Sequence, residues 1–254
     1  MKNLLVVLFC CLCFSSQAEH TYDLSFKRVA GNVYTYVNYG SFDGQRYAAN
    51  AVYLVTKDGV VLFDTPWDKE YFQPLLDSIW QRHHEKVIMC LSTHFHEDRT
   101  AGLTYYAAKG IKTFTTRQTD SLCMLNHNPR ARFIMPKDTV FHVGGEVFQV
   151  YYPGPGHSAD NLVIWLPEYR VLYGGCLIKS TGANSLGNLE DANVSEWEKS
   201  LKRVRRKFPH PDFIIVGHED WRNKRSIKHT LDLLSDYRKA HALLKRPLKL
   251  SQKR

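Results

Sequence analysis

The chain has 254 residues and a formal net charge of +9, and 44% of the residues are hydrophobic. This composition supports one large domain or two small ones with a packed core, and it excludes a disordered or low-complexity protein. Seven Lys or Arg and no acid lie between residues 238 and 254. The charge is therefore predicted to be a property of a solvated tail, with weak attachment to anionic lipid as the alternative. No basic face suited to nucleic acid is expected on the domain.

Residues 1–18 have the pattern of a secretory signal peptide. Lys2 precedes the apolar run LLVVLFCCLCF, and Ser-Ser-Gln-Ala ends the segment with a small-x-Ala cleavage signature. The run is too short for a membrane span, which needs about 20 residues. We predict cleavage after Ala18 and export to the periplasm without a stable membrane anchor. Three cysteines then remain, at positions 90, 123 and 176, and this odd number suggests one thiol with a special role.

Apolar periodicity and turn residues predict an alternation of strands and helices. The expected strands are 32–39, 50–56, 59–64, 86–93, 112–116, 146–152, 161–167, 169–175 and 212–217. The expected helices are 68–84, 100–110, 118–127, 194–208 and 226–245. Between the first two strands, GSFDGQRYAA (40–49) is either a mobile loop with an exposed Phe42 or an ordinary hairpin loop with a tucked Phe42. The order favours a mixed α/β protein with sheet in the middle and helices outside.

No linker separates the two halves, so one domain is predicted over residues 19–237, followed by a basic extension over 238–254.

Candidate metal ligands follow predicted strands. They are His94, His96 and Asp98 in HFHED, His157 in PGPGHSADN, Cys176 in YGGC and His218 in VGHED. Loops that leave one edge of a sheet converge in space, so these side chains are expected to meet. The remaining histidines are interpreted as ordinary surface or core residues.

Imidazole, thiolate and carboxylate are zinc ligands, and six of them are too many for one tetrahedral ion. Divided three and three, they leave an open position on each of two zinc ions, which is the form of catalytic sites. Residues i and i+2 of an extended segment point the same way, so His94 and His96 are expected to bind one ion while Asp98 reaches the other.

The pattern HFHEDR…PGHSADN…GGCLIKS…LGN…GHEDW resembles the metallo-β-lactamases of subclass B-one, particularly chromosomal enzymes of flavobacterium-type bacteria. The resemblance covers roughly residues 22–236. It implies an αββα sandwich, with His94, His96 and His157 on the first zinc and Asp98, Cys176 and His218 on the second. It also implies a monomeric enzyme that confers resistance to β-lactam antibiotics, including carbapenems.

The resemblance further implies roles around the metals. Lys179 would hold the carboxylate of a β-lactam, Asn188 would polarise the lactam carbonyl, and Phe42 and Trp67 would contact substrate. Asp64 and Arg99 would lie behind the ligands. The implied reaction is hydrolysis of the ring amide of penicillins, cephalosporins and carbapenems by a metal-bound hydroxide, with Asp98 orienting the water that protonates the leaving nitrogen.

Two alternatives remain at this stage. The first is another hydrolase of the same fold, of the thioester or nuclease type. Those relatives resemble H-x-H-x-D-H, whereas this chain has Arg99 after Asp98. The second is a non-enzymatic zinc-binding module, which would be expected to use four ligands in a closed site.

Overall fold

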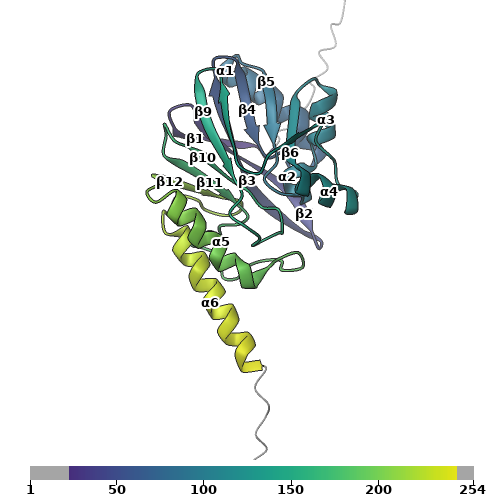
Figure 1. Cartoon of the computed structure of the whole chain (residues 1–254). Coiled ribbons are helices and arrows are strands. Elements are labelled where there is room, and N and C mark those ends of the chain that lie inside the picture. Colours follow the sequence, from purple (N-terminus) through teal and green to yellow (C-terminus); the bar gives the residue numbers. More distant parts are fainter. Residues whose placement is uncertain (1–22, 245–254) are drawn as a thin grey trace, which may run out of the picture.

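The computed structural model describes residues 23–244 of the chain (Figure 1). The predicted signal peptide therefore lies outside the described residues, as does most of the predicted C-terminal extension. Within residues 23–244, no helix has the length and apolar character needed to cross a membrane. Helix α6 (Ser226–Leu244) continues past residue 237, where the extension was predicted to begin.

Two β-sheets form the centre of the molecule. The first sheet has seven strands in chain order: β1 (Ser25–Ala30), β2 (Val33–Phe42), β3 (Gln45–Thr56), β4 (Gly59–Phe63), β5 (Val87–Leu91), β6 (Lys112–Thr116) and β7 (Phe133–Met135). The second sheet has five, in the spatial order β12 (Phe213–Val216), β11 (Val171–Gly175), β10 (Val163–Leu166), β9 (Glu146–Tyr151) and β8 (Thr139–Val143).

Helices flank these sheets. They are η1 (Lys69–Tyr71), α1 (Phe72–His83), α2 (Glu97–Thr100), α3 (Leu103–Ala108), α4 (Arg117–Leu125), α5 (Val194–Lys207) and α6. Figure 1 shows α5 and α6 side by side over the second sheet, away from α1 and α3 at the first sheet. The predicted αββα sandwich is confirmed.

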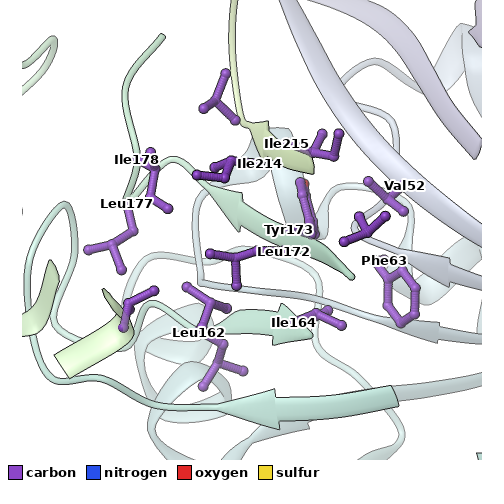
Figure 2. Close-up of a cluster of buried hydrophobic side chains, with 14 of the residues drawn as sticks. Val52, Phe63, Leu162, Ile164, Leu172, Tyr173, Leu177, Ile178, Ile214 and Ile215 are labelled. Carbon is purple, nitrogen blue, oxygen red and sulfur yellow. The ribbon is translucent and has the colours of Figure 1, made fainter. Parts of the chain in front are cut away.

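Strand β4 and the second half of β3 are buried on both faces, and the alternation of their side chains divides the core in two. Val52 and Phe63 point toward the second sheet and pack with residues such as Ile164 and Leu172 (Figure 2). Tyr53 and the other intervening residues pack instead against α1 and α3. This period of two is what a strand between two apolar layers requires.

The segment 40–49 is a regular part of the sheet. Strands β2 and β3 pair along their whole length to Phe42 and Gln45, leaving only Asp43 and Gly44 in the turn. Both turn residues have positive φ, 49° and 72°, as expected for the tight turn that matches strand twist. Phe42 is 49% exposed at the tip, so the hairpin alternative was right about the loop and wrong about the tucked side chain.

The predicted helix 100–110 is interrupted. The N–H group of Gly102 donates to Thr65 Oγ1 at 2.9 Å instead of continuing the helical ladder, so α2 and α3 are separate. The strands β1, β7 and β8 were not predicted. All three lie at sheet edges or next to them, and their exposed residues hide the apolar alternation.

Parallel pairing brings the functional loops to one edge. Strands β4 and β5 run parallel, as do β11 and β12, so the loops after their carboxyl ends emerge together. The two sheets are joined there by backbone hydrogen bonds, from Asn50 N to Gly217 O at 2.8 Å and from Leu162 N to Thr93 O at 2.8 Å. The predicted meeting place of the ligands is therefore built into the sheet topology.

We predict that Phe63→Ala lowers the free energy of unfolding by about 3–5 kcal/mol, because the ring is fully buried between the sheets. Chemical denaturation at fixed zinc concentration measures this loss. Phe133→Ala is the matched control, since that ring is 40% exposed and its removal leaves no comparable cavity. Equal losses for the two variants would contradict the assigned core.

Candidate metal centre

Three histidines converge on one point. His94 Nε2 lies 3.1 Å from His96 Nδ1, which in turn lies 3.1 Å from His157 Nε2. His94 and His157 are buried and His96 is partly exposed. The loops after β5 and β9 bring the three rings together, although 61 residues separate His96 from His157.

Acceptors fix the proton positions of most of these rings. Asp191 Oδ2 lies 3.0 Å from His96 Nε2, so that nitrogen carries the hydrogen and Nδ1 keeps its lone pair. Thr93 Oγ1 donates to Asp64 Oδ2 at 2.9 Å and lies 3.3 Å from His94 Nδ1. Its single proton is used, so His94 Nδ1 must donate and His94 Nε2 is free. The free nitrogens are the ones that face each other.

A second trio lies beside the first. Asp98 Oδ2 lies 3.2 Å from His218 Nε2 and 3.7 Å from Cys176 Sγ, and the sulfur is 3.4 Å from the same nitrogen. His218 Nδ1 is 2.8 Å from the carbonyl oxygen of Ala48, which can only accept, so Nδ1 donates and Nε2 is the nitrogen that faces Asp98 and Cys176. His94 is close to Asp98 and to Cys176, which makes the two trios adjacent.

The spacing of these atoms fits zinc. A tetrahedral zinc with bonds of about 2.0–2.1 Å to nitrogen holds two nitrogens about 3.3 Å apart, and a sulfur at about 2.3 Å lies about 3.6 Å from nitrogen. The observed separations of 3.1 Å in the first trio and 3.4 Å between Cys176 and His218 are close to these values. The residues therefore fit two incomplete ligand sets, one of nitrogens and one with a thiolate and a carboxylate.

The protonation of these groups is consistent with cation binding. Burial lowers the pKa of His94 and of His157 well below the usual value, which keeps both imidazoles in the neutral form that binds metal. Burial acts on His218 in the same direction, but Cys176 and Asp98 outweigh it and raise the pKa to about 9. The second trio thus attracts positive charge even without a metal.

Arg99 is a fully buried cation behind the second trio. Its Nη2 is 2.9 Å from Asp98 Oδ2 and donates to Cys176 Sγ at 3.1 Å. Its Nη1 donates to Asn50 O at 2.7 Å and to the Tyr173 hydroxyl at 3.1 Å. Nη2 also lies 3.3 Å from His218 Nε2, so the planar guanidinium contacts all three members of the trio and two strands at once.

Asp64 is the carboxylate that supports the opposite side of this network. It accepts from Thr93 N at 2.6 Å and from the Tyr173 hydroxyl, and Arg99 Nη1 is 3.6 Å away. Complete burial raises the pKa of Asp64 to about 6, although Arg99 and these donors act in the opposite direction. Asp64 and Arg99 thus lie beside each other, and Arg99 in turn contacts Asp98 of the second trio.

Lys179 lies near both trios and interacts electrostatically with Cys176, Asp98 and His157. Burial lowers the pKa of its ammonium, and Nζ is 5.5 Å from the centre of the Trp197 ring. A Cβ atom built on Gly187 would lie 3.5 Å from Nζ, so Lys179 reaches the loop that carries Asn188. The amide oxygen of Asn188 accepts from Glu190 N at 3.0 Å, and its side chain is exposed.

Trp67 and Phe42 occupy the hairpin side. The Trp67 ring is edge-on to His218, with the ring centres 6.2 Å apart, and the backbone N–H group of Trp67 donates to Asn38 Oδ1 at 2.8 Å. A Cβ atom on Gly40 would come within 2.3 Å of this ring, so glycine is required there. Phe42, farther along the same hairpin, has no ring contact among the described residues and faces solvent.

Several contributors were not predicted from the sequence. Asp191 is hydrogen-bonded to His96, and Thr93 contacts both Asp64 and His94. Gly217 leaves room for the side chains of Cys176 and Arg99. A Cβ atom on Gly217 would lie 2.7 Å from Cys176 Sγ and 2.8 Å from Arg99 Nη2. Asp191 had a weak signal, because it lies in the Asn188 loop and the second nitrogen of a metal-binding histidine needs an acceptor.

We predict that Asp191→Ala weakens zinc binding at the three-histidine trio by about 10–100-fold, because His96 loses the acceptor that orients it. Zinc titration against a competing chelator measures the change. Glu190→Ala is the control, as the adjacent side chain is exposed and makes no contact with a histidine. A loss confined to Glu190→Ala, or none in either variant, would contradict the role.

We predict that Arg99→Lys destabilises the protein by on the order of 3 kcal/mol, because an ammonium cannot reproduce the contacts of a buried guanidinium. Denaturant unfolding gives this value. The same substitution at Arg130 changes little, since that exposed residue pairs with Asp120 at the surface. Similar behaviour of the two variants would show that Arg99 does not organise the centre.

The chain is similar to proteins of known family. A family model described as metallo-beta-lactamase superfamily matches residues 44–218. Metallo-beta-lactamase type 2 of Elizabethkingia meningoseptica is 43% identical over 237 residues, covering 93% of this chain and 95% of that protein. Metallo-beta-lactamase IND-1 of Chryseobacterium indologenes is 41% identical over 207 residues, covering 82% and 87%.

Solved structures agree with these matches. The crystal structure of metallo-beta-lactamase IND-7 aligns with a TM-score of 0.81 at 40% identity, over 84% of this chain and 98% of that one. The metallo-beta-lactamase from Pontibacter korlensis has the same TM-score at 32% identity, over 84% and 99%.

Proposed function

The chain belongs to the metallo-β-lactamase family, and from this membership we propose that it hydrolyses the ring amide of β-lactam antibiotics and so confers resistance. The observation that carries the proposal is the pair of adjacent donor trios, one of three histidines in mutual contact and one of Asp98, Cys176 and His218. Each trio leaves a position open for water or substrate, as catalytic zinc sites do.

We propose two zinc ions per chain. His94, His96 and His157 would hold one, and Asp98, Cys176 and His218 the other. Zinc in such sites supplies an activated water and an electrophile for the carbonyl oxygen. The acceptors described above would orient His94, His96 and His218 so that the other nitrogen of each ring points at its ion.

The remaining residues would bind and orient the substrate. Lys179 would pair with the carboxylate that β-lactams carry, and the amide N–H of Asn188 would donate to the lactam carbonyl oxygen as it gains negative charge. Trp67 and Phe42 would cover the apolar part of the substrate.

Hydrolysis adds the oxygen of water to the carbonyl carbon and breaks the C–N bond, so the ring nitrogen must gain a proton. Asp98, whose Oδ2 already faces His218 and Cys176, would orient the water that delivers it. Arg99 would keep Asp98 ionised for this task, as it holds the pKa of that carboxyl well below its usual value in spite of burial. Asp98 and Asn188 are therefore the proposed catalytic residues of the chain.

The alternative within the fold, a thioester hydrolase or nuclease, is less well supported. Arg99 stands where those relatives carry a histidine ligand. The Arg99 guanidinium is fully buried and donates to Cys176 Sγ. Arg99 would therefore support the second trio, and the thiolate of Cys176 would take the place of that histidine as a ligand of the second zinc.

The test is turnover of a chromogenic cephalosporin and of a carbapenem by the purified chain, with and without a chelator. We expect two zinc per chain and hydrolysis of both substrates that the chelator abolishes and added zinc restores. Two bound zinc without chelator-sensitive turnover would overturn the proposed function. Turnover of the cephalosporin alone would remove only the carbapenem substrate.

We predict that Cys176→Ser weakens one of the two zinc ions by more than about 100-fold and leaves the other in place, because a hydroxyl is a poor replacement for a thiolate. Zinc titration with activity measured in parallel gives both readouts. Cys123→Ser is the control, because this buried thiol donates to Phe95 O at 3.9 Å and belongs to none of the candidate metal-binding groups among residues 23–244. Unchanged stoichiometry in Cys176→Ser would exclude the sulfur as a ligand.

We also propose that the chain works in the periplasm as a monomer, after cleavage of residues 1–18, with the catalytic domain over 19–237 and a basic extension over 238–254. The sequence of the leader supports export and cleavage. The mass of the exported chain and its elution volume in size exclusion test it. An uncleaved or dimeric protein would contradict it.

A further inference from the structure

A basic surface lies on the folded domain, separate from the tail. Between residues 199 and 228 there are ten Lys or Arg and three Asp or Glu. Between residues 23 and 198 there are 16 Lys or Arg and 19 Asp or Glu. The near-zero charge of the body therefore conceals an uneven distribution, and the expectation that the positive charge belongs to the tail alone is wrong.

This surface contains a hollow of about 460 Å³ where the end of α5 meets the connection from β12 to α6. Its buried floor is apolar and includes Phe208, Ile214 and Ile227. Its rim is cationic and is formed by Arg170, Arg205, Lys224, Arg225 and Lys228. We call the rim and floor together the α5–α6 hollow.

Some of the cationic side chains of the rim have no ion-pair partner among the described residues. Asp212, the one acid in the lining, is already shared by Arg170 at 2.8 Å and Lys224 at 3.4 Å. Arg205 and Arg225 are exposed and have no ion pair within residues 23–244. Two unpaired guanidiniums above an apolar floor suit a partner that is anionic and apolar at once.

The position of the hollow separates it from the metal centre. Arg170 and Asp212 precede β11 and β12, whereas Cys176 and His218 follow the same two parallel strands. A partner at the hollow would therefore meet the opposite end of these strands and leave the metal centre open to substrate.

We propose that the α5–α6 hollow docks the protein reversibly on an anionic lipid membrane. The rim cations would bind the phosphates of the head groups, and the apolar floor would contact the glycerol and acyl region of one lipid. A membrane fits better than a nucleic acid, because none of the exposed large hydrophobic side chains of residues 23–244 lies in this segment to stack on bases.

The test is cosedimentation of the full-length chain with vesicles of 30% phosphatidylglycerol and 70% phosphatidylcholine, compared with pure phosphatidylcholine. We expect binding only to the anionic vesicles, weakened at least tenfold between 50 and 300 mM salt. Arg205→Gln with Arg225→Gln should weaken binding by about 25-fold, as each cation near an anionic surface contributes about fivefold.

Lys86→Gln with Lys112→Gln is the matched control, because both lysines are exposed, lie outside the hollow and make the same change in net charge. We expect its vesicle affinity within twofold of the parent, and cephalosporin turnover in solution unchanged in both double variants. A loss of turnover in the double variant of Arg205 and Arg225 would show a folding defect. In that case the single variants Arg205→Gln and Arg225→Gln are used instead. Weaker vesicle binding with intact turnover in these single variants would support the proposal, and unchanged binding would contradict it.

The proposal would be overturned by equal binding to neutral vesicles or by equal weakening in the two double variants. Tighter binding to single-stranded DNA than to anionic vesicles would also overturn it. Deletion after Leu244 distinguishes the hollow from the tail. If that deletion abolishes vesicle binding and the arginine variants do not weaken it, the tail alone binds lipid.

Discussion

The buried guanidinium of Arg99 is the constraint on which the centre depends. It joins the loop after β5 to strand β3 through Asn50 O and to the second sheet through Gly217 O and the Tyr173 hydroxyl. A buried cation is costly unless opposite charges and acceptors face it, and here Asp98, Asp64 and the sulfur of Cys176 do so. Because these partners come from both sheets, the position of the second trio is determined by the packing of the sandwich.

The histidines depend on a second principle. An imidazole has one lone pair to offer, and the group bound to its other nitrogen decides which nitrogen offers it. Ala48 O, Asp191 and the Thr93–Asp64 pair perform this task for His218, His96 and His94. These three imidazoles are therefore oriented by the fold itself, and the groups that orient them extend from strand β3 to the loop before α5.

Much of this could be predicted from the sequence, and the reasons for the exceptions are physical. Strands such as β5 and β11 are buried, so their apolar runs are clear, and the ligands follow them at once. The edge strands β7 and β8 are partly exposed and have no such pattern. Asp191 could not be assigned, because its partner His96 is 95 residues away and only the folded chain brings them together. The basic hollow was missed because a net charge contains no information about where the charges lie.

The central claim is that two trios of side chains bind two metal ions, with Arg99 behind one of them. Anomalous diffraction at the zinc absorption edge, measured on crystals of the zinc-loaded protein, tests it most directly. The account predicts two zinc peaks, one within bonding distance of His94, His96 and His157 and one within bonding distance of Asp98, Cys176 and His218. A single peak, or a second peak away from Cys176, would contradict it.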